Sequence, residues 1–80
     1  MEKYGMCRVD KRATGRNIKA LLKSSSYSME DWLNYLAVLN DKSVYKWYKG
    51  TTLPRLEHLL LMARLLHVHI EDIVVCEDDA

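Results

Sequence analysis

The sequence predicts a small all-α domain of five helices, preceded by a short arm, and three observations support this. Apolar residues recur at helical spacing in several stretches of the chain. Phe is absent and leucines dominate the second half, which favours a helical core. The length of 80 residues allows one domain, near the lower size at which a chain buries a core unaided. We therefore expect an arm at residues 1–13, a helical domain at 14–75 and an acidic tail at 76–80.

The two ends of the chain lack helical periodicity. Polar and apolar residues alternate between Met6 and Asp10, so the arm is expected to be extended or to form a short strand. The C-terminal sequence VVCEDDA is a candidate partner strand. Cys7 and Cys76 belong to no CxxC pair, and we expect both to stay reduced in a cytosol. A bridge between the termini is the alternative.

Two helices are expected before residue 40. The first begins at Thr14 and ends at the serines of residues 24–26, because serine disfavours helix interiors. Ser28 is the expected N-cap of the second helix, with Asp31 completing a shortened capping box. The inward side chains of the two helices are Ile18, Leu21 and Leu22 in the first, and Met29, Trp32, Leu33 and Leu36 in the second. A tight apolar turn follows at residues 37–39.

A third, short helix is expected at about residues 41–48. Either Asn40 or Asp41 caps its start. Val44 and Trp47 are spaced to point inward, and Gly50 fits the left-handed position that ends a helix.

A leucine-rich stretch predicts the remaining two helices. Pro54 is placed at the first position of the fourth helix, where its missing N–H costs nothing. This helix ends near His67, and a short fifth helix follows at about residues 70–74. The core-facing residues expected in the fourth helix are Leu56, Leu59, Leu60, Ala63 and Leu66.

The net charge of +1 conceals a split along the chain. Residues 1–55 hold 11 Lys and Arg against 5 Asp and Glu, giving +6, whereas residues 56–80 hold 1 against 6, giving −5. Such asymmetry indicates a basic face directed at an anion, with nucleic acid as the leading partner. The second and third helices, joined by a tight turn, match the helix-turn-helix arrangement, which inserts its second helix into the major groove of DNA.

Two motifs in the second half of the chain are specific. VYKWYKGTTLP, residues 44–54, is similar to an Ile-x-x-Trp-x-x-Gly-x-x-x-Pro signature, and LLLMARLLHVHIEDI, residues 59–73, is similar to a leucine-rich fourth helix followed by a short fifth. Through them residues 18–75 resemble the lambda-repressor-like helix-turn-helix family of the Xre and Cro type. This resemblance implies a compact five-helix DNA-binding domain and a transcriptional regulator, most simply a repressor.

The resemblance also implies roles for individual residues. The family's base-reading positions fall on Asp41, Lys42, Tyr45 and Lys46. Asp41 has a second interpretation, as the helix cap alone. The phosphate-contacting positions, which set register without reading sequence, fall on Lys49, Thr51, Thr52 and Arg55.

Three departures from the family pattern stand out. Met29 replaces a glutamine that many members place first in the second helix. The turn before the third helix is one residue longer than the commonest pattern, which shifts the base-reading set by about one position. Leu22 and Tyr48 replace an arginine–glutamate pair, and replacing both charges together by apolar groups is compatible with a folded, repacked variant.

Other functions are disfavoured by the sequence. The spacing of His58, His67 and His69 matches no common zinc pattern, so neither a metal nor another cofactor is expected. No nucleophile-elbow motif surrounds the serines, so an enzyme is not expected. No apolar run approaches the roughly 20 residues of a membrane helix, and we expect a soluble cytoplasmic protein without a membrane partner.

The leading hypothesis is a regulator that binds double-stranded DNA as a homodimer, because one short recognition helix reads only a few base pairs. The dimer surface is expected on the fourth and fifth helices, with Ile70, Ile73, Val74 and Val75. The rival hypothesis is a module that binds a protein partner, such as the antitoxin of a toxin pair. Sensing, in either case, is expected to come from a partner or from the cysteines.

Overall fold

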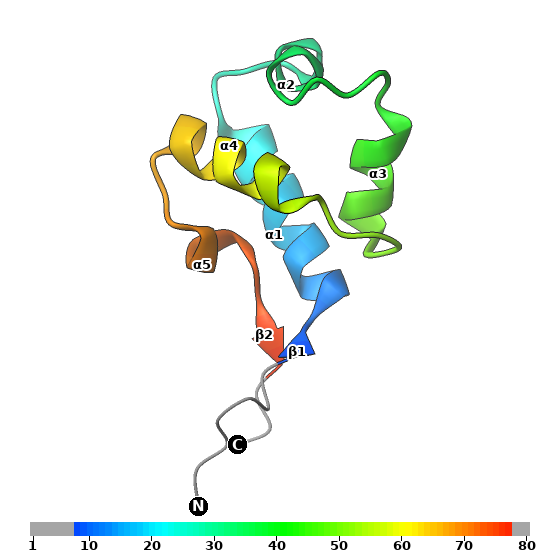
Figure 1. Cartoon of the computed structure of the whole chain (residues 1–80), viewed down its shortest axis with the longest axis vertical. Helices are drawn as coiled ribbons and strands as arrows, with labels where there is room; N and C mark the ends of the chain where they lie inside the picture. Colours follow the sequence, from blue (N-terminus) through cyan, green and yellow to red (C-terminus); the bar gives the residue numbers. More distant parts are fainter. Residues whose placement is uncertain (1–7, 78–80) are drawn as a thin grey trace, which may run out of the picture.

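The computed structural model describes residues 8–77, and within that range the protein is mainly helical (Figure 1). The elements are β1 Arg8–Val9, α1 Lys11–Ser24, α2 Met29–Tyr35, α3 Lys42–Lys49, α4 Leu56–Leu66, α5 Ile70–Ile73 and β2 Cys76–Glu77. The prediction of five helices is therefore confirmed, with a two-stranded sheet added. Within the described range, none of the helices has the length and apolar character needed to cross a bilayer.

The sheet joins the two ends of the described chain. β1 pairs antiparallel with β2, placing Arg8 opposite Glu77 and Val9 opposite Cys76. The prediction that the arm pairs with the C-terminal segment is confirmed for these residues. Cys76 is disulfide-bonded, so the expectation that this thiol stays reduced is wrong. Strand pairing places Val9 opposite Cys76. Cys7 lies outside the described residues.

Helix α1 begins three residues earlier than predicted. Asp10 is its N-cap, and the carboxylate accepts a hydrogen bond from the Ala13 N–H at 3.0 Å. A side chain that satisfies an otherwise free first-turn N–H fixes the start of a helix. The first helix therefore starts at Lys11 instead of the predicted Thr14.

Polar side chains of α1 hold the C-terminal segment. Thr14 is completely buried, and its hydroxyl accepts a hydrogen bond from the Val75 N–H at 2.9 Å. The side-chain amide of Asn17 donates to the carbonyl oxygens of Asp72 and Ile73, at 2.6 and 3.0 Å. These bonds satisfy backbone groups at the end of α5 that would otherwise lack partners.

Helices α1 and α3 approach each other so closely that only glycine fits between them. Gly15 is buried, and a β-carbon there would clash with the carbonyl oxygen of Trp47 and lie 2.6 Å from that of Tyr48. Gly50 ends α3 as predicted, with φ of 79°, and a β-carbon there would lie 2.9 Å from the Cα of Arg12. The C-terminal end of α3 is thus positioned against α1.

The core lies between these helices and contains most of the predicted apolar residues. Trp32 is buried and its indole N–H donates to the Ser25 hydroxyl at 3.2 Å. The predicted capping box of α2 is confirmed: the Ser28 hydroxyl accepts from the Asp31 N–H at 3.1 Å, and the Asp31 carboxylate accepts from the Ser28 N–H at 3.0 Å. The buried apolar residues are Ile18, Leu22, Trp32, Leu36, Val44, Trp47, Met62, Ala63 and Ile73.

Helix α4 starts later and faces differently than predicted. Arg55 is extended and forms the N-cap, so the helix starts at Leu56, and Pro54 is buried before the helix instead of occupying its first position. Leu56 and Leu60 are exposed, whereas Met62 is completely buried. The inward residues are Leu59, Met62, Ala63 and Leu66, which also have helical spacing. Assigning Leu56 and Leu60 to the core was wrong because this leucine-rich stretch contains two overlapping stripes.

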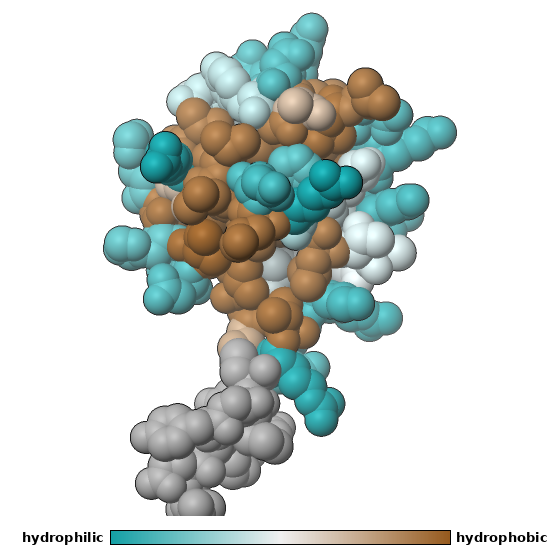
Figure 2. Space-filling view, viewed as in Figure 1, coloured by the Kyte–Doolittle hydropathy of each residue, from teal (hydrophilic) through white to brown (hydrophobic). Residues whose placement is uncertain are grey.

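Exposed apolar side chains gather on α4, one of the two helices predicted to carry the dimer surface. Ile73 is completely buried in the core, so its assignment to a dimer surface is wrong. Figure 2 shows a continuous apolar area over the face on which α4 lies in Figure 1. The exposed leucines of α4 are Leu56, Leu60 and Leu61.

The connection between α2 and α3 covers residues 36–41 and has an unusual conformation. Ala37 has φ of 56°, and Leu39 is 99% exposed. The left-handed backbone costs a residue with a β-carbon roughly 1–2 kcal/mol.

Replacing Ala37 with glycine should therefore stabilise the fold. Removing the β-carbon relieves the strain, and the added flexibility of the unfolded chain offsets part of the gain, leaving about 0.5–1 kcal/mol. The melting temperature should rise by a few degrees in thermal unfolding. Ala20→Gly, at an exposed site inside α1, is the matched control and should lower stability. Equal destabilisation by both changes would contradict the left-handed turn.

Candidate nucleic-acid interface

Helix α3 has one buried and one charged face. Val44 and Trp47 are buried, as predicted from their spacing. The three lysines of α3 are exposed, and its sequence KSVYKWYK has no acidic residue. An α-helix with its side chains is about 10–12 Å across, close to the roughly 12 Å width of the major groove of DNA. The outward positions include Lys42, Tyr45, Lys46 and Lys49.

The start of α3 decides between the two predicted caps. The Asn40 side-chain oxygen accepts a hydrogen bond from the Lys42 N–H at 3.0 Å. Asp41 occupies the N-cap position, but its side chain makes no capping hydrogen bond. The interpretation of Asp41 as a cap alone is therefore wrong, and its carboxylate, at the start of the lysine-rich face, is left for another role.

Tyr45 is held by its neighbour one turn later. The rings of Tyr45 and Tyr48 are 5.7 Å apart and meet edge to face, at 71°. Burial, together with the nearby Tyr45, raises the pKa of the Tyr48 hydroxyl above its ordinary value. Tyr45 itself remains about half exposed. Its ring therefore sits at a defined position on the outward face of α3, as base contact requires.

Leu22, Met29 and Tyr48, which the sequence comparison singled out, lie together. Leu22 is buried, Tyr48 packs against the core, and both line one cavity of about 360 Å³ between α1, α2 and α3. Met29 lines the same cavity and packs against the core. This region is an apolar and aromatic junction.

The predicted phosphate contacts follow α3 closely. The backbone N–H groups of Thr51 and Thr52 both donate to the Lys46 carbonyl oxygen, at 3.0 and 3.5 Å. These bonds turn the chain back over the end of α3. Lys49, Thr51, Thr52 and Arg55 are all exposed.

Arg12 belongs to the same surface, although the sequence placed it in the arm. Its backbone lies directly against Gly50, the residue after Lys49, and its side chain is exposed. Recognising Asp10 as the cap of α1 would have placed Arg12 in the first turn of that helix. Cations from α1 and from the end of α3 therefore lie on one side of the molecule.

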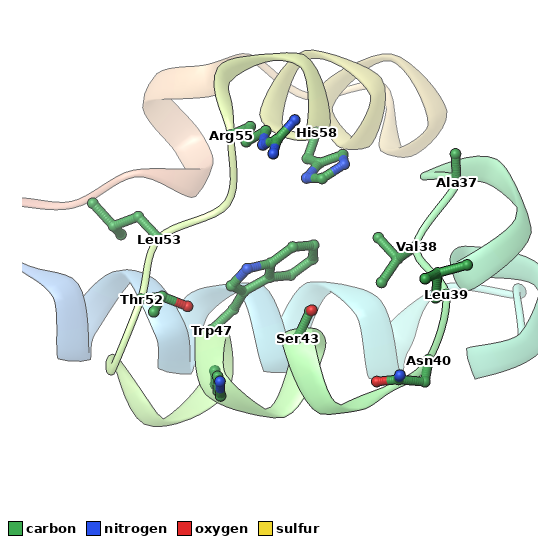
Figure 3. Close-up of a pocket in the computed structure, with 11 residues that line it drawn as sticks. Ala37, Val38, Leu39, Asn40, Ser43, Trp47, Thr52, Leu53, Arg55 and His58 are labelled. Carbon is green, nitrogen blue, oxygen red and sulfur yellow. The ribbon is translucent and has the colours of Figure 1, made fainter.

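A pocket of about 510 Å³ opens beside these residues, and we call it the turn pocket (Figure 3). It lies between the α2–α3 turn, α3, the α3–α4 loop and the start of α4. Three predicted DNA contacts line it, namely Lys46, Thr52 and Arg55. None of the described residues lining it is Asp or Glu. Predicted base and phosphate contacts thus meet at one cavity that sequence patterns did not indicate.

His58 and Trp47 form the inner part of the turn pocket. Their ring centres are 5.4 Å apart and the rings are tilted by 45°. The Nδ1 atom of His58 is buried and has no hydrogen-bond partner among residues 8–77. In Figure 3, His58 hangs from α4 over the space between Trp47 and Val38.

The other histidines serve as helix ends. His67 ends α4 with a left-handed backbone, φ 58°. His69 precedes α5, and its N–H donates to the Asp72 carboxylate at 2.9 Å. Across the part of the chain that the structure describes, no three His, Cys, Asp or Glu side chains lie close enough to hold a metal ion.

Comparison with known proteins identifies no relative of this chain. No family model, no curated protein and no solved structure matches the chain.

Proposed function

We propose that the protein binds duplex DNA by inserting α3 into the major groove, as a transcriptional regulator of the lambda-repressor-like type. The observation that carries the proposal is the division of α3: Val44 and Trp47 fix it in the core, while its lysines and Tyr45 face outward with no acid on the helix. A cationic helix supported on a rigid core is what groove recognition requires.

The surroundings of α3 support the same proposal. Lys49 ends the cationic face of α3, and Arg12 and Arg55 extend it beyond the helix, where phosphates would flank the groove. The connection from α2 to α3 differs from common helix-turn-helix proteins, because six residues separate the helices instead of the usual three or four. This longer connection sets the depth at which Asp41 and Lys42 enter the groove.

Lys46→Ala and Lys49→Ala should affect DNA binding differently. Wild-type protein should bind random duplex DNA at about 50 mM salt, with affinity falling steeply as salt rises. Lys49→Ala should weaken all sequences alike and reduce the salt slope by about 1. Lys46→Ala should instead relax sequence preference. The DNA sequences that the variant selects from a random pool should therefore be more varied than those that the wild-type protein selects.

The matched control is Arg64→Ala, which removes one exposed cation from α4, away from the proposed surface. It should leave both the salt slope and the sequence preference unchanged. Equal losses from all three changes would point to nonspecific charge attraction. An absence of DNA binding at low salt would overturn the proposal and favour the rival function.

The rival function is protein binding, and the exposed leucines of α4 favour it. Leu56 is 69% exposed beside Leu60 and Leu61, an apolar surface of the kind that marks protein contacts. In the DNA-binding proposal the same surface is available to a second copy of the chain, which would present two copies of α3 to adjacent half-sites.

A further inference from the structure

We propose that the turn pocket binds a small organic anion, an aromatic carboxylate, with its ring beside Trp47 and His58 and its carboxylate at Arg55. The site itself does not depend on the proposed function. Its size, about 510 Å³, falls within the range of roughly 300–1,000 Å³ that is typical of ligand pockets.

The charge of the turn pocket selects an anion. Lys46 and Arg55 both line it, and no carboxylate of the described chain does so. Helix α4 starts at its rim, and the N-cap residue provides no side-chain hydrogen bond to the first turn. Unsatisfied first-turn N–H groups add to the positive potential around the cavity. A carboxylate fits an arginine guanidinium through two parallel hydrogen bonds.

The remaining lining selects an apolar, ring-shaped body. Val38 and Trp47 face each other across the space, as Figure 3 shows, and Leu53 also contributes to the lining. A bare phosphate would leave this apolar wall unused, whereas an aromatic ring removes it from water. The lining therefore combines an apolar wall with a cationic rim, the pattern expected for an amphipathic anion.

His58 supplies the polar group that fixes the ligand's orientation. Its Nδ1 atom is buried without a partner among the described residues, and a buried polar atom without a partner is costly. The imidazole of His58 lines the turn pocket, whereas its Nδ1 atom is enclosed, so a ligand oxygen gives this atom a partner if the ring turns toward the cavity. The orphaned atom distinguishes the turn pocket from a surface cluster of cations.

Occupancy of the turn pocket has a consequence that rests on the proposed function. The ligand would neutralise Lys46 and Arg55, which are assigned to DNA bases and phosphate, and would occupy the space beside Thr52. A bound carboxylate should therefore compete with DNA. The α2–α3 connection forms one wall of the turn pocket, so a ligand bound there would lie within the proposed DNA-binding domain itself.

Benzoate is the test ligand, added to the full-length protein without DNA and followed by two-dimensional NMR and calorimetry. The chain has two tryptophans, and their indole N–H signals report on different places. Trp47 lines the turn pocket, whereas the Trp32 indole is hydrogen-bonded to Ser25. Benzoate should shift the Trp47 signal saturably and leave that of Trp32 nearly unmoved. Benzamide, a neutral analogue of the same shape, should bind at least about tenfold more weakly.

Three substitutions assign the contacts. Arg55→Gln should weaken benzoate binding about tenfold or more. His58→Phe retains a ring against Trp47 but lacks Nδ1. It should weaken the binding of benzoate, while dispersed indole N–H signals show that the variant is still folded. Lys42→Gln removes an α3 cation that does not line the pocket, so benzoate affinity should stay unchanged.

Several results would overturn the ligand site. If inorganic phosphate bound as tightly as benzoate, the turn pocket would be a general anion site without preference for an aromatic ring. Equal shifts of both indole signals would mean that benzoate binds nonspecifically. Benzamide binding as well as benzoate would refute the role of charge. Failure of DNA binding would leave these outcomes unaffected, because they are measured without DNA. Competition is tested separately, by the loss of DNA affinity on adding benzoate.

Discussion

Gly15→Ala should destabilise the protein by about 2–3 kcal/mol, although the same change inside an ordinary helix is stabilising. Alanine is favoured over glycine in a helix interior by roughly 0.5–1 kcal/mol. At Gly15 the new methyl group would meet the backbone carbonyl oxygens of Trp47 and Tyr48, which cannot rotate away as a side chain can. Overpacking of this kind typically costs 1–3 kcal/mol or more, so steric repulsion outweighs helix propensity.

Thermal unfolding measures this effect directly, and the melting temperature should fall by about 10 °C or more. Arg16→Ala, on the exposed side of the same helix, is the control and should change it little. The indole signal of Trp47 should move in the Gly15 variant, because α3 must shift to make room. A neutral or stabilising Gly15→Ala would show that α1 and α3 are farther apart than described.

Thr14→Val should cost about 1–2 kcal/mol, although valine has nearly the same shape as threonine. The substitution keeps the buried volume and removes the oxygen that accepts from the Val75 N–H. Leaving a partly buried donor without an acceptor costs roughly 1–3 kcal/mol, and the lower part of that range applies near the surface. Denaturant unfolding gives the stability change.

Amide exchange identifies the cause of the loss. Val75 should exchange faster in Thr14→Val, because its hydrogen bond is absent, but should stay protected in Thr14→Ser, which keeps the hydroxyl. The serine variant loses one buried methyl group and should therefore lose about 1 kcal/mol by a different route. Unchanged exchange of Val75 in the valine variant would argue against this bond.

Local signals in the sequence were sufficient for α2 and α3. The Ser28 and Asp31 capping pair, the inward spacing of Val44 and Trp47, and the glycine at position 50 each act over one turn of helix. Such features are decided by neighbouring residues, so a sequence reading can identify them. The exposure of the predicted DNA-contacting residues follows from the same spacing.

Local signals could not show which face of α4 packs against the core. In LLLMARLL, residues 59–66, several helical stripes are apolar, and periodicity cannot choose among them. The choice is made by what the rest of the fold places against α4, which buries Met62 and exposes Leu60. The turn pocket was missed for a related reason, since it depends on the path of residues 36–41, where Ala37 adopts a backbone that its residue type does not indicate.

The contacts of α1 were also outside the reach of sequence patterns. Gly15 looks like a weak point of the helix until α3 is seen against it, and Asn17 looks like a solvent-facing residue until its amide is seen to hold α5. Both roles depend on segments distant in the chain. A single sequence contains no local signal for either.

The single turn Thr14–Asn17, with the sequence TGRN, holds α3 on one side and the C-terminal segment on the other. It contains no aliphatic or aromatic residue, so a survey of this chain by hydrophobicity would rank it among the most freely replaceable stretches. The geometry implies the reverse. In engineering this domain, the exposed leucines of α4 offer more freedom than Thr14, Gly15 and Asn17, where the tolerance for substitution should be narrowest.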